Sequence, residues 1–519
     1  MLRRAAALAT FAVLVAIPAV QQVDAALVEA VSPASMPKIA VVDDRFASYN
    51  IEMLGVTGGA FWAPYDASRL EAGGAEQGAS TTRQRALYQQ RPPIDLDHPR
   101  LRRLAAALGP AYVRVSGTWA NTTFFADARE TPATVPPGFT GVLPSARWRS
   151  LIAFATAVNA DIVTSFAISA GTRDANGNWT SEQAKRWLDA TRAARGRIAA
   201  VEFMNEPTLA AKNGAPAGYD AMRYGQDFKT FYAFIRQDAP GTLVLGPGAI
   251  GEKVDTPLLR AADLFAASEP DVVDAVSYHH YGALSQRCAA SGAQTRADAA
   301  LSEQWLARTD AALAFVRPLR DRFAPRKPVW LTETADAACG GNPWASTFLD
   351  SFRYLDQLGR LARQDVKVVM HNTLVWSDYG LLDEQSFRPR PNYWAALLWR
   401  RLMGRVVLDA GIEPREGLHL YAHCLRDEPG GVALLAINTS RAQASVVRLP
   451  REMGGRRYTL SAATLDAPQV RLNGQELALG ADDRLPDLLG DATVSDVLEF
   501  APATLSFVAF PKADNRSCK

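Results

Sequence analysis

The sequence has little net charge. Its 519 residues contain 56 Lys and Arg against 54 Asp and Glu, for a formal net charge of +2. Charge so close to zero excludes a generally basic nucleic-acid-binding protein, so an acidic ligand would have to be held by locally placed basic residues. With 48% hydrophobic residues, the chain is neither disordered nor collagen-like. Its length allows about three domains of ~150 residues, or fewer if one of them is a large barrel.

The sequence also lacks an apolar run long enough to cross a membrane. Its most apolar run, Ala5–Val20, is shorter than the ~20 residues that a membrane-spanning helix needs. Arg3 and Arg4 precede the run, and Val23-Asp24-Ala25 ends in a small residue that signal peptidases accept. We therefore expect residues 1–25 to be a secretory signal peptide and the protein to be secreted or periplasmic. An N-terminal anchor is the alternative.

Cysteines are scarce as well, with only Cys288, Cys339, Cys424 and Cys518. An even number of cysteines in an exported protein favours disulfides, and four cysteines allow three pairings. A catalytic thiol at Cys339 is the alternative, but nothing around it resembles a Cys-His site.

Between about residues 46 and 403, apolar runs alternate with segments of helical periodicity. The runs predict strands at Phe46–Leu54, Tyr112–Ser116, Ile162–Ile168, Ala200–Asn205, Thr242–Leu245, Val273–Tyr278, Pro328–Glu333 and Lys367–Asn372. The helical segments include Leu101–Leu108, Ser145–Val158, Ser181–Ala194, Asp227–Gln237, Asp298–Val316 and Ser346–Arg363. Eight strand-then-helix units predict an α/β fold, a (β/α)8 TIM barrel over residues 46–403.

After Gly404 the pattern changes to short strands separated by turn signals such as Asn473-Gly474. Residues 404–519 therefore predict an antiparallel β-sandwich domain. The apolar stretch Ile39–Val42 can add a strand to it, so we expect residues 26–45 to pack on this domain. There is no internal repeat.

Two of the expected barrel strands end in glutamate. One runs into Asn205-Glu206-Pro207, where the proline ends the strand, and another ends at Glu333. A single glutamate at such a rim is usually solvated or salt-bridged. These two follow strands 4 and 7, whose ends face one another across the mouth of a barrel, and two facing carboxylates are what glycosidic bond cleavage requires.

Longer motifs carry a resemblance to a known family. They are Pro110–Thr118, Val276–Tyr281, Trp330–Thr334 with Gly340-Gly341, Tyr379–Glu384 and Pro391–Trp394. Together they resemble the heparanase-like glycoside hydrolases of family 79, unevenly from about residue 46 to the C-terminus. In that family the strand-4 glutamate is the general acid/base and the strand-7 glutamate is the nucleophile of a retaining mechanism. The resemblance thus implies Glu206 as acid/base, Glu333 as nucleophile and Asn205 as a ligand of the sugar 2-OH.

The same resemblance implies a subsite for glucuronic acid. Glu52 matches the family's acidic sugar-binding residue on strand 1, which is aspartate in the animal enzyme. Thr118 matches a contact to a sugar hydroxyl, Tyr281 lies near the nucleophile, and Tyr379 with Gly380 lies in a loop resembling the uronate-carboxylate site. Backbone N–H groups and a tyrosine bind a carboxylate without net positive charge.

Adjacent histidines at 279 and 280 point to opposite faces of a strand, so they cannot both ligate one metal. We expect one of them, taken as His279, to line the sugar site or orient Glu333, and we expect no metal or cofactor. For flanking sulfated sugars, the loops after strands 4, 5 and 6 carry Lys212, Lys253 and Arg287, close to basic positions of the family.

The family also has a disulfide that staples its terminal strand, which implies a Cys424–Cys518 pair. Cys288 and Cys339 lie on loops after neighbouring strands, so a second bridge at the cleft rim is expected.

The interpretation is a secreted, retaining endo-β-D-glucuronidase, a monomer acting on heparan sulfate or a related acidic polysaccharide, without nucleic-acid partner or membrane span. The alternatives are an exo-acting β-glucuronidase, an enzyme for hyaluronan or arabinogalactan glucuronides, and a catalytically silent glycan-binding protein.

Overall fold

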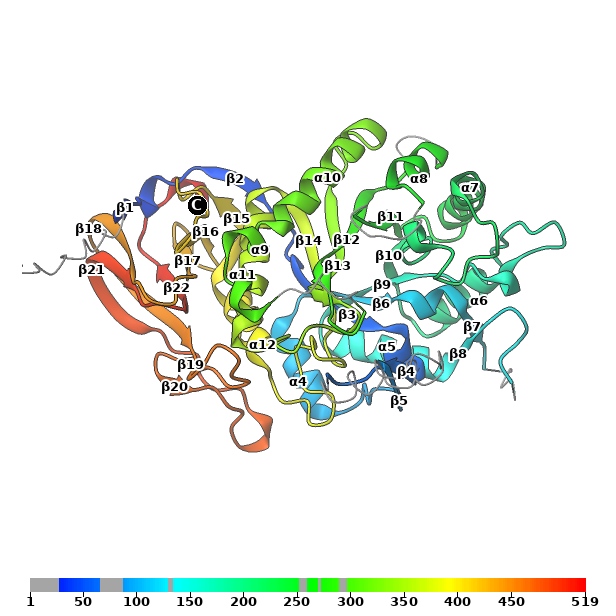
Figure 1. Cartoon of the computed structure of the whole chain (residues 1–519), viewed down its shortest axis with the longest axis horizontal. Coiled ribbons are helices and arrows are strands. Elements are labelled where there is room, and N and C mark those ends of the chain that lie inside the picture. Colours follow the sequence, from blue (N-terminus) through cyan, green and yellow to red (C-terminus); the bar gives the residue numbers. More distant parts are fainter. Residues whose placement is uncertain (1–27, 66–86, 129–133, 252–258, 269–271, 289–295) are drawn as a thin grey trace, which may run out of the picture.

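Eight parallel strands close into a barrel at the centre of the computed structural model (Figure 1). In chain order they are β3 (Ala47–Glu52), β6 (Ala111–Ser116), β9 (Ala160–Ser165), β10 (Ile198–Glu202), β11 (Leu243–Ile250), β12 (Ala275–Leu284), β13 (Val329–Ala338) and β14 (Val366–His371). The structure describes residues 28–65, 87–128, 134–251, 259–268, 272–288 and 296–519. The expected signal peptide, residues 1–25, lies outside these ranges.

Helices follow the strands and cover the barrel. They are α1 (Met53–Thr57), α4 (Pro99–Leu108), α5 (Ser145–Ala157), α6 (Glu182–Ala193), α7 (Ala221–Asp238), α8 (Ala261–Ala267), α9 (Glu303–Leu306), α10 (Arg308–Phe323), α11 (Phe348–Arg363) and α12 (Pro391–Leu402). In α4, for example, Leu101, Leu104, Ala105 and Leu108 form one buried face at helical spacing. Two short pairs of strands lie beside the barrel. Strand β4 (Gly59–Trp62) is antiparallel to β5 (Tyr88–Arg91), and β7 (Thr123–Ala126) is parallel to β8 (Gly141–Pro144).

All eight expected strands take part in the barrel, so the (β/α)8 prediction is confirmed. The helix expected over Asp298–Val316 is instead two, because Ser302 caps the short α9 and a second helix starts at Arg308. Helix α8 was not expected, because its seven residues are too few to show a clear helical periodicity in the sequence.

The barrel interior changes from apolar to polar along the strand direction. One buried layer consists of Tyr112, Val163, Ala200, Leu245, Ala275, Trp330, Val368 and Met370, with Ala199 beside it. Two residues further along five of these strands, the same faces carry Arg114, Ser165, Glu202, Ser277 and Thr332, all buried. Glu202 contacts both Arg114 and Thr332, and their three strands are not neighbours, so this face points into the barrel. The apolar layer is thus a floor beneath a polar layer at the C-terminal ends of the strands.

A second, mostly antiparallel sheet packs beside the barrel and forms the left part of Figure 1. It consists of β1 (Val28–Ala30), β2 (Lys38–Val41), β15 (Met403–Leu408), β16 (His419–Leu425), β17 (Val432–Asn438), β18 (Ser445–Ser461), β19 (Arg471–Leu472), β20 (Gln475–Glu476), β21 (Asp491–Phe500) and β22 (Thr504–Phe510). The long β18 pairs with β21 over its first part and with β22 over its last, which joins two layers. Val447 and Leu498 of one layer share a core with Leu434 and Phe510 of the other. The expected N-terminal strand is β2, paired with β15.

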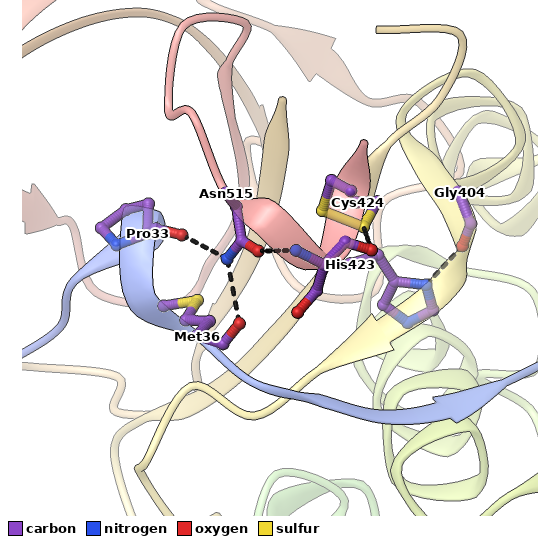
Figure 2. Close-up of a disulfide and its surroundings, with 8 residues drawn as sticks. Pro33, Met36, Gly404, His423, Cys424 and Asn515 are labelled. Atoms are coloured by element: carbon purple, nitrogen blue, oxygen red, sulfur yellow. Dashed lines mark hydrogen bonds between the residues drawn. A yellow bond between two sulfur atoms is a disulfide. The ribbon is translucent and has the colours of Figure 1, made fainter. Parts of the chain in front are cut away.

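Both expected disulfides are present, Cys288–Cys339 and Cys424–Cys518. The second one fixes the C-terminal segment to β16 (Figure 2). Beside it, the Asn515 side chain donates to the carbonyl oxygens of Pro33 and Met36, at 2.7 and 2.9 Å. The two ends of the described chain are thereby held on the same sheet. Within the described ranges, none of the helices combines the length and the apolar character that crossing a membrane requires.

Candidate active site

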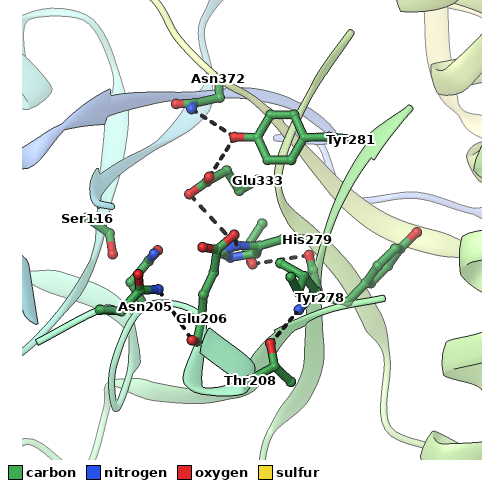
Figure 3. A network of polar contacts seen from close by, with 12 residues as sticks. Ser116, Asn205, Glu206, Thr208, Tyr278, His279, Tyr281, Glu333 and Asn372 are labelled. Atoms are coloured by element: carbon green, nitrogen blue, oxygen red, sulfur yellow. Dashed lines mark hydrogen bonds and ion pairs between the residues drawn. The ribbon is translucent and has the colours of Figure 1, made fainter. Parts of the chain in front are cut away.

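Glu206 and Glu333 meet at the C-terminal end of the barrel, where Figure 3 shows both of them next to His279. The chain turns sharply after β10, and Glu206 takes a left-handed conformation with φ 47° before Pro207 begins a short 3-10 helix. Glu333 lies within β13, and His279 is its neighbour on β12. One carboxylate oxygen of each glutamate and one ring nitrogen of His279 all lie within 4.8 Å of one another. The two strand-end carboxylates predicted from the sequence are therefore brought together.

Arg114 connects the polar layer of the barrel to this pair. Its guanidinium is buried and donates to Glu202 at 2.9 Å, to Glu333 Oε2 at 2.8 Å and to the Asn205 side-chain oxygen at 2.8 Å. The rigid fork of an arginine can serve several oxygens at once, which a lysine cannot. Arg114 thus fixes the orientation of Glu333 and, through Asn205, of the turn that carries Glu206.

The surroundings of Glu333 favour its ionised form. Burial by itself raises the pKa of a carboxyl, but the charges of His279 and Arg114 and the hydrogen bonds from Tyr281 and Arg114 outweigh burial and lower the pKa of Glu333 below its ordinary value. The Tyr281 hydroxyl donates to Oε1 at 2.6 Å while Arg114 holds Oε2. Glu333 is consequently a fixed carboxylate.

His279 links the two glutamates. Its Nδ1 lies 3.1 Å from Glu206 Oε1, and its Nε2 lies 3.3 Å from a guanidinium nitrogen of Arg114. Because a carboxylate oxygen only accepts, Nδ1–H donates to Glu206. Burial lowers the pKa of His279, but the nearby Glu333 and Glu206 more than compensate and raise it. Glu206 therefore has one oxygen held by His279 and the other available.

Behind Glu333, Asn372 holds two tyrosines and a third glutamate. Its amide group donates to the Tyr281 hydroxyl at 3.0 Å, to Glu52 Oε1 at 3.0 Å and to the Tyr379 hydroxyl at 3.4 Å. Since Tyr281 accepts from Asn372, its own proton is directed to Glu333 (Figure 3). This places the predicted residues Glu52, Tyr281 and Tyr379 in one network with the candidate nucleophile.

Glu52 differs electrostatically from Glu333. Burial and the charge of Glu333 raise the pKa of Glu52 to about 8, against the lowering contacts of Asn372 and Arg114. Its Oε2 is buried, and among the described residues no hydrogen-bond partner reaches that atom. A Cβ atom at Gly117 would lie 1.8 Å from Oε2, so only glycine fits against it. Glu52 is thus a neutral carboxyl group at pH 7, and one of its oxygens is buried and unpaired among the described residues.

A tight turn at Gly340-Gly341 closes another side of the site. Both glycines have positive φ, 83° and 89°. The Ser377 hydroxyl donates to Gly340 O at 2.9 Å and the Ser285 hydroxyl to Gly341 O at 2.7 Å, while Gly341 lies against the Tyr379 ring. In a trans peptide the N–H points opposite to the C=O, so the fixed Gly340 carbonyl turns the Gly341 N–H to the other side. The N–H behind the Gly341 carbonyl belongs to Asn342 and donates to Asp336 Oδ2 at 2.9 Å.

The remaining predicted residues differ in their surroundings. Thr118 is half-buried and directly follows Gly117, whereas Lys212 is exposed. The Gly380 N–H, expected to bind a carboxylate, donates to Ser377 O at 3.3 Å. Lys253 lies outside the described residues.

Arg287, expected on the rim as a sulfate contact, is only 4% exposed and is paired with Asp378. Its guanidinium also stacks over the Tyr65 ring. A buried, paired guanidinium is not free to bind a flanking sulfate, so this expectation is corrected.

Glu206, His279 and Glu333 are close enough to share a metal ion. However, the Arg114 guanidinium already occupies the cation position next to both Glu333 and His279, at 2.8 and 3.3 Å. The donor set does not fit a resident metal ion.

Sequence reasoning did not identify Arg114, Glu202 or Asn372. The signal for the first two was a charged residue inside an otherwise apolar strand, as in Tyr112–Ser116. A buried charge needs a partner, so such positions deserve to be read as members of an ion pair.

Sequence comparison matches the family description "Glycosyl hydrolase family 79, N-terminal domain" to residues 93–359. Heparanase-like protein 1 of Arabidopsis thaliana is 30% identical over 370 residues, 67% of this chain and 65% of that protein. Heparanase of Gallus gallus is 28% identical over 451 residues, 76% of this chain and 84% of that protein. The chain therefore spans slightly less than two thirds of the plant relative's length. The matched range includes Arg114, Glu206, His279 and Glu333.

Among solved structures, a 4-O-α-L-rhamnosyl-β-D-glucuronidase from Fusarium oxysporum aligns with 93% of this chain and 100% of its own, with a TM-score of 0.61. The sequences are 14% identical, so this likeness concerns the fold alone.

Proposed function

The chain belongs to glycosyl hydrolase family 79, and from this premise we propose that it is a retaining endo-β-D-glucuronidase of the heparanase type. Its proposed substrate is heparan sulfate or a related glycosaminoglycan containing glucuronic acid. The proposal places the protein outside the cytoplasm, in agreement with its two disulfides.

The proximity of Glu206 and Glu333 is the observation that carries the proposal. Carboxyl groups of retaining glycosidases lie ~5–5.5 Å apart, whereas inverting enzymes need ~6.5–9.5 Å to admit a water molecule. In this chain, an oxygen of Glu206 and an oxygen of Glu333 lie within 4.8 Å. That distance supports double displacement.

In the proposed reaction, Glu333 attacks the anomeric carbon while the glycosidic C–O bond breaks and the leaving oxygen takes a proton from Glu206. Water then attacks the anomeric carbon and gives a proton to Glu206. The bond between the sugar and Glu333 breaks in this step, which frees the Glu333 carboxylate. The roles follow from the surroundings. Glu333 is held as a carboxylate by Arg114 and Tyr281, and Glu206 has one oxygen free to exchange a proton. Asn205 is oriented by Arg114 and is proposed to bind the sugar 2-OH.

Neutral and backbone groups support recognition of the uronate. Tyr379, the amides of the Gly340-Gly341 turn and the neutral carboxyl of Glu52 surround the network that holds Glu333. Amide N–H groups bind a carboxylate without a counter-charge. This fits a protein whose net charge is close to zero. Lys212 is exposed and stays available for a flanking sulfate.

A defined heparosan oligosaccharide tests the proposal. Internal cuts, seen as products of intermediate size, are expected from an endo-glucuronidase. Release of glucuronic acid monosaccharide would instead identify an exo-acting enzyme. If only hyaluronan or arabinogalactan glucuronides are cleaved, the substrate belongs to that class instead of heparan sulfate. Binding without turnover of any uronate polymer would identify a silent glycan-binding protein. Proton NMR of the first product formed should show the β-anomer, since a retaining enzyme preserves the configuration.

Glu52 is expected to limit activity at alkaline pH. Its folded pKa of about 8 means that it is neutral below this pH and becomes charged above it, next to ionised Glu333 and a uronate carboxylate. The kcat/KM for an aryl β-D-glucuronide should therefore fall as the pH rises through about 8. In Glu52→Gln, the neutral amide cannot ionise, so this alkaline limb should disappear, while Glu52→Asp should keep one. Persistence of the same limb in Glu52→Gln would assign it to another group.

A further inference from the structure

We propose that Arg287 is a positioning residue, which together with the Cys288–Cys339 disulfide holds the Gly340-Gly341 turn in the conformation that receives the carboxylate of the substrate. The inference rests on the proposed function, because it takes a uronate as the ligand. It also replaces the expectation that Arg287 binds sulfate groups on the cleft rim.

The guanidinium of Arg287 lies against the carbonyl groups of the turn. One terminal nitrogen is 3.4 Å from both the Cys339 and the Gly340 carbonyl oxygens, and the other is paired with Asp378. A Cβ atom on Gly340 would come within 2.3 Å of this guanidinium, so the contact is close and requires glycine. The planar fork of arginine suits such a set of three oxygens, whereas the single ammonium group of lysine does not.

Hydroxyl groups complete the anchoring of the carbonyls. Ser377 donates to Gly340 O and Ser285 donates to Gly341 O, at 2.9 and 2.7 Å. With the Cys339 and Gly340 carbonyls on the Arg287 side, the N–H groups of Gly340 and Gly341 point away from Arg287. Successive N–H groups presented by such a turn form a concave anion site. Arg287 therefore acts on a bound carboxylate through the turn, without touching it.

The disulfide fastens the same two loops covalently. Cys288 directly follows Arg287, and Cys339 directly precedes Gly340. The loops that follow β12 and β13 are thus joined at the one place where Arg287 contacts the turn. The other disulfide, Cys424–Cys518, lies in the second sheet and offers a matched control.

The test compares a Cys288→Ser/Cys339→Ser double variant, Arg287→Lys and Ser377→Ala with the wild-type protein. For an aryl β-D-glucuronide we expect KM to rise ~10-fold in the first two variants and ~3-fold in Ser377→Ala, because weakened hydrogen bonds to a charged group carry effects of this size. The kcat should stay within about 3-fold, since Glu206 and Glu333 are untouched. An aryl β-D-glucoside lacks the carboxylate, so its KM should not change. The Cys424→Ser/Cys518→Ser control should leave both KM values unchanged.

Several results would overturn the inference. Equal KM increases for glucuronide and glucoside would indicate general loosening of the site, as would the same effect in the control pair. A defect confined to sulfated polymer, with normal cleavage of the aryl glucuronide, would return Arg287 to a direct sulfate contact. If the wild-type protein prefers the glucuronide but all variants keep its KM, the inference alone is wrong. If the wild-type protein shows no such preference, the proposed function is wrong and the inference falls with it.

Discussion

Replacing Glu333 by glutamine is expected to reduce turnover of an aryl β-D-glucuronide by at least ~10⁴-fold, because the amide cannot form the glycosyl-enzyme bond. The side chain is nearly isosteric, and its oxygen can still accept from Arg114 while its NH2 group faces the Tyr281 hydroxyl oxygen, so binding of substrate should largely persist. The measurement is kcat under saturating substrate, with circular dichroism to verify folding. An activated 2-fluoro-glucuronide should label Glu333 in the wild-type protein, as found by peptide mass spectrometry. Labelling at another residue would contradict the assignment.

Glu206→Gln provides the complementary half of this prediction. General acid/base catalysis contributes ~10²–10⁴-fold, so the loss should fall in that range for a poor leaving group. It should be much smaller for a dinitrophenyl glucuronide, whose leaving group needs no proton, whereas Glu333→Gln should be equally impaired on both. Glu413→Gln is the matched control, because Glu413 is a largely exposed partner of Arg363 and should have no effect. Independence of the Glu206→Gln defect from the leaving group would reject Glu206 as the acid/base.

The barrel could be predicted because its information is local. Each strand is a short apolar run and each helix has an apolar face, so periodicity alone located all eight strands. Their order followed from the strand-then-helix alternation. What periodicity missed is short, such as α8, or depends on a capping residue, such as Ser302, which splits one expected helix into two.

The candidate site was only partly predictable, because much of it consists of contacts between distant segments. Glu206 and Glu333 stand at strand ends, where the fold itself makes them meet. Arg114 looks like a misplaced charge within a strand until the barrel closes and brings Glu202 and Glu333 to it. Arg287 looks like a loop cation, and its burial depends on Asp378, 91 residues away. Loop position alone does not reveal such a partner.

The near-zero net charge has a structural counterpart in this arrangement. Arg114 and Arg287, two cations near the site, are buried and already paired with carboxylates. Among the described residues of the site, the groups that remain for a uronate are amide N–H groups, tyrosine hydroxyls and a neutral glutamic acid. Binding of a uronate by such groups should depend only weakly on salt, because little mobile charge is involved.

The contact between barrel and second sheet is expected to depend strongly on one buried ion pair. Asp356 of α11 and His419 of β16 are both almost fully buried and lie 2.5 Å apart, with Arg360 and the Tyr421 hydroxyl also bound to Asp356. Glu303 Oε2 lies 3.1 Å from the other ring nitrogen of His419. Asp356→Asn leaves His419 and Arg360 without their main counter-charge. Removing one partner of a buried pair costs about 3–5 kcal/mol, which we expect as the loss in the free energy of unfolding in urea at pH 6.

The pH dependence of this loss identifies its cause. Burial lowers the pKa of His419, but Asp356 and Glu303 raise it from 6.5 to about 9, so its contribution is complete below about pH 6.5 and is lost as the pH rises through about 9. Asp356 is the reverse case: burial raises its pKa, but His419 and Arg360 lower it to about 2, so its contribution is lost only on acidification through that value. The difference between wild type and Asp356→Asn should therefore shrink by roughly 2–3 kcal/mol between pH 6 and pH 9. Asp189→Asn removes an exposed carboxylate on α6 that pairs with Lys185 and Arg192, and it should leave the stability almost unchanged at either pH. A loss in Asp356→Asn that is as small as in this control, or equal at both pH values, would show that the Asp356–His419 charge pair does not stabilise the contact.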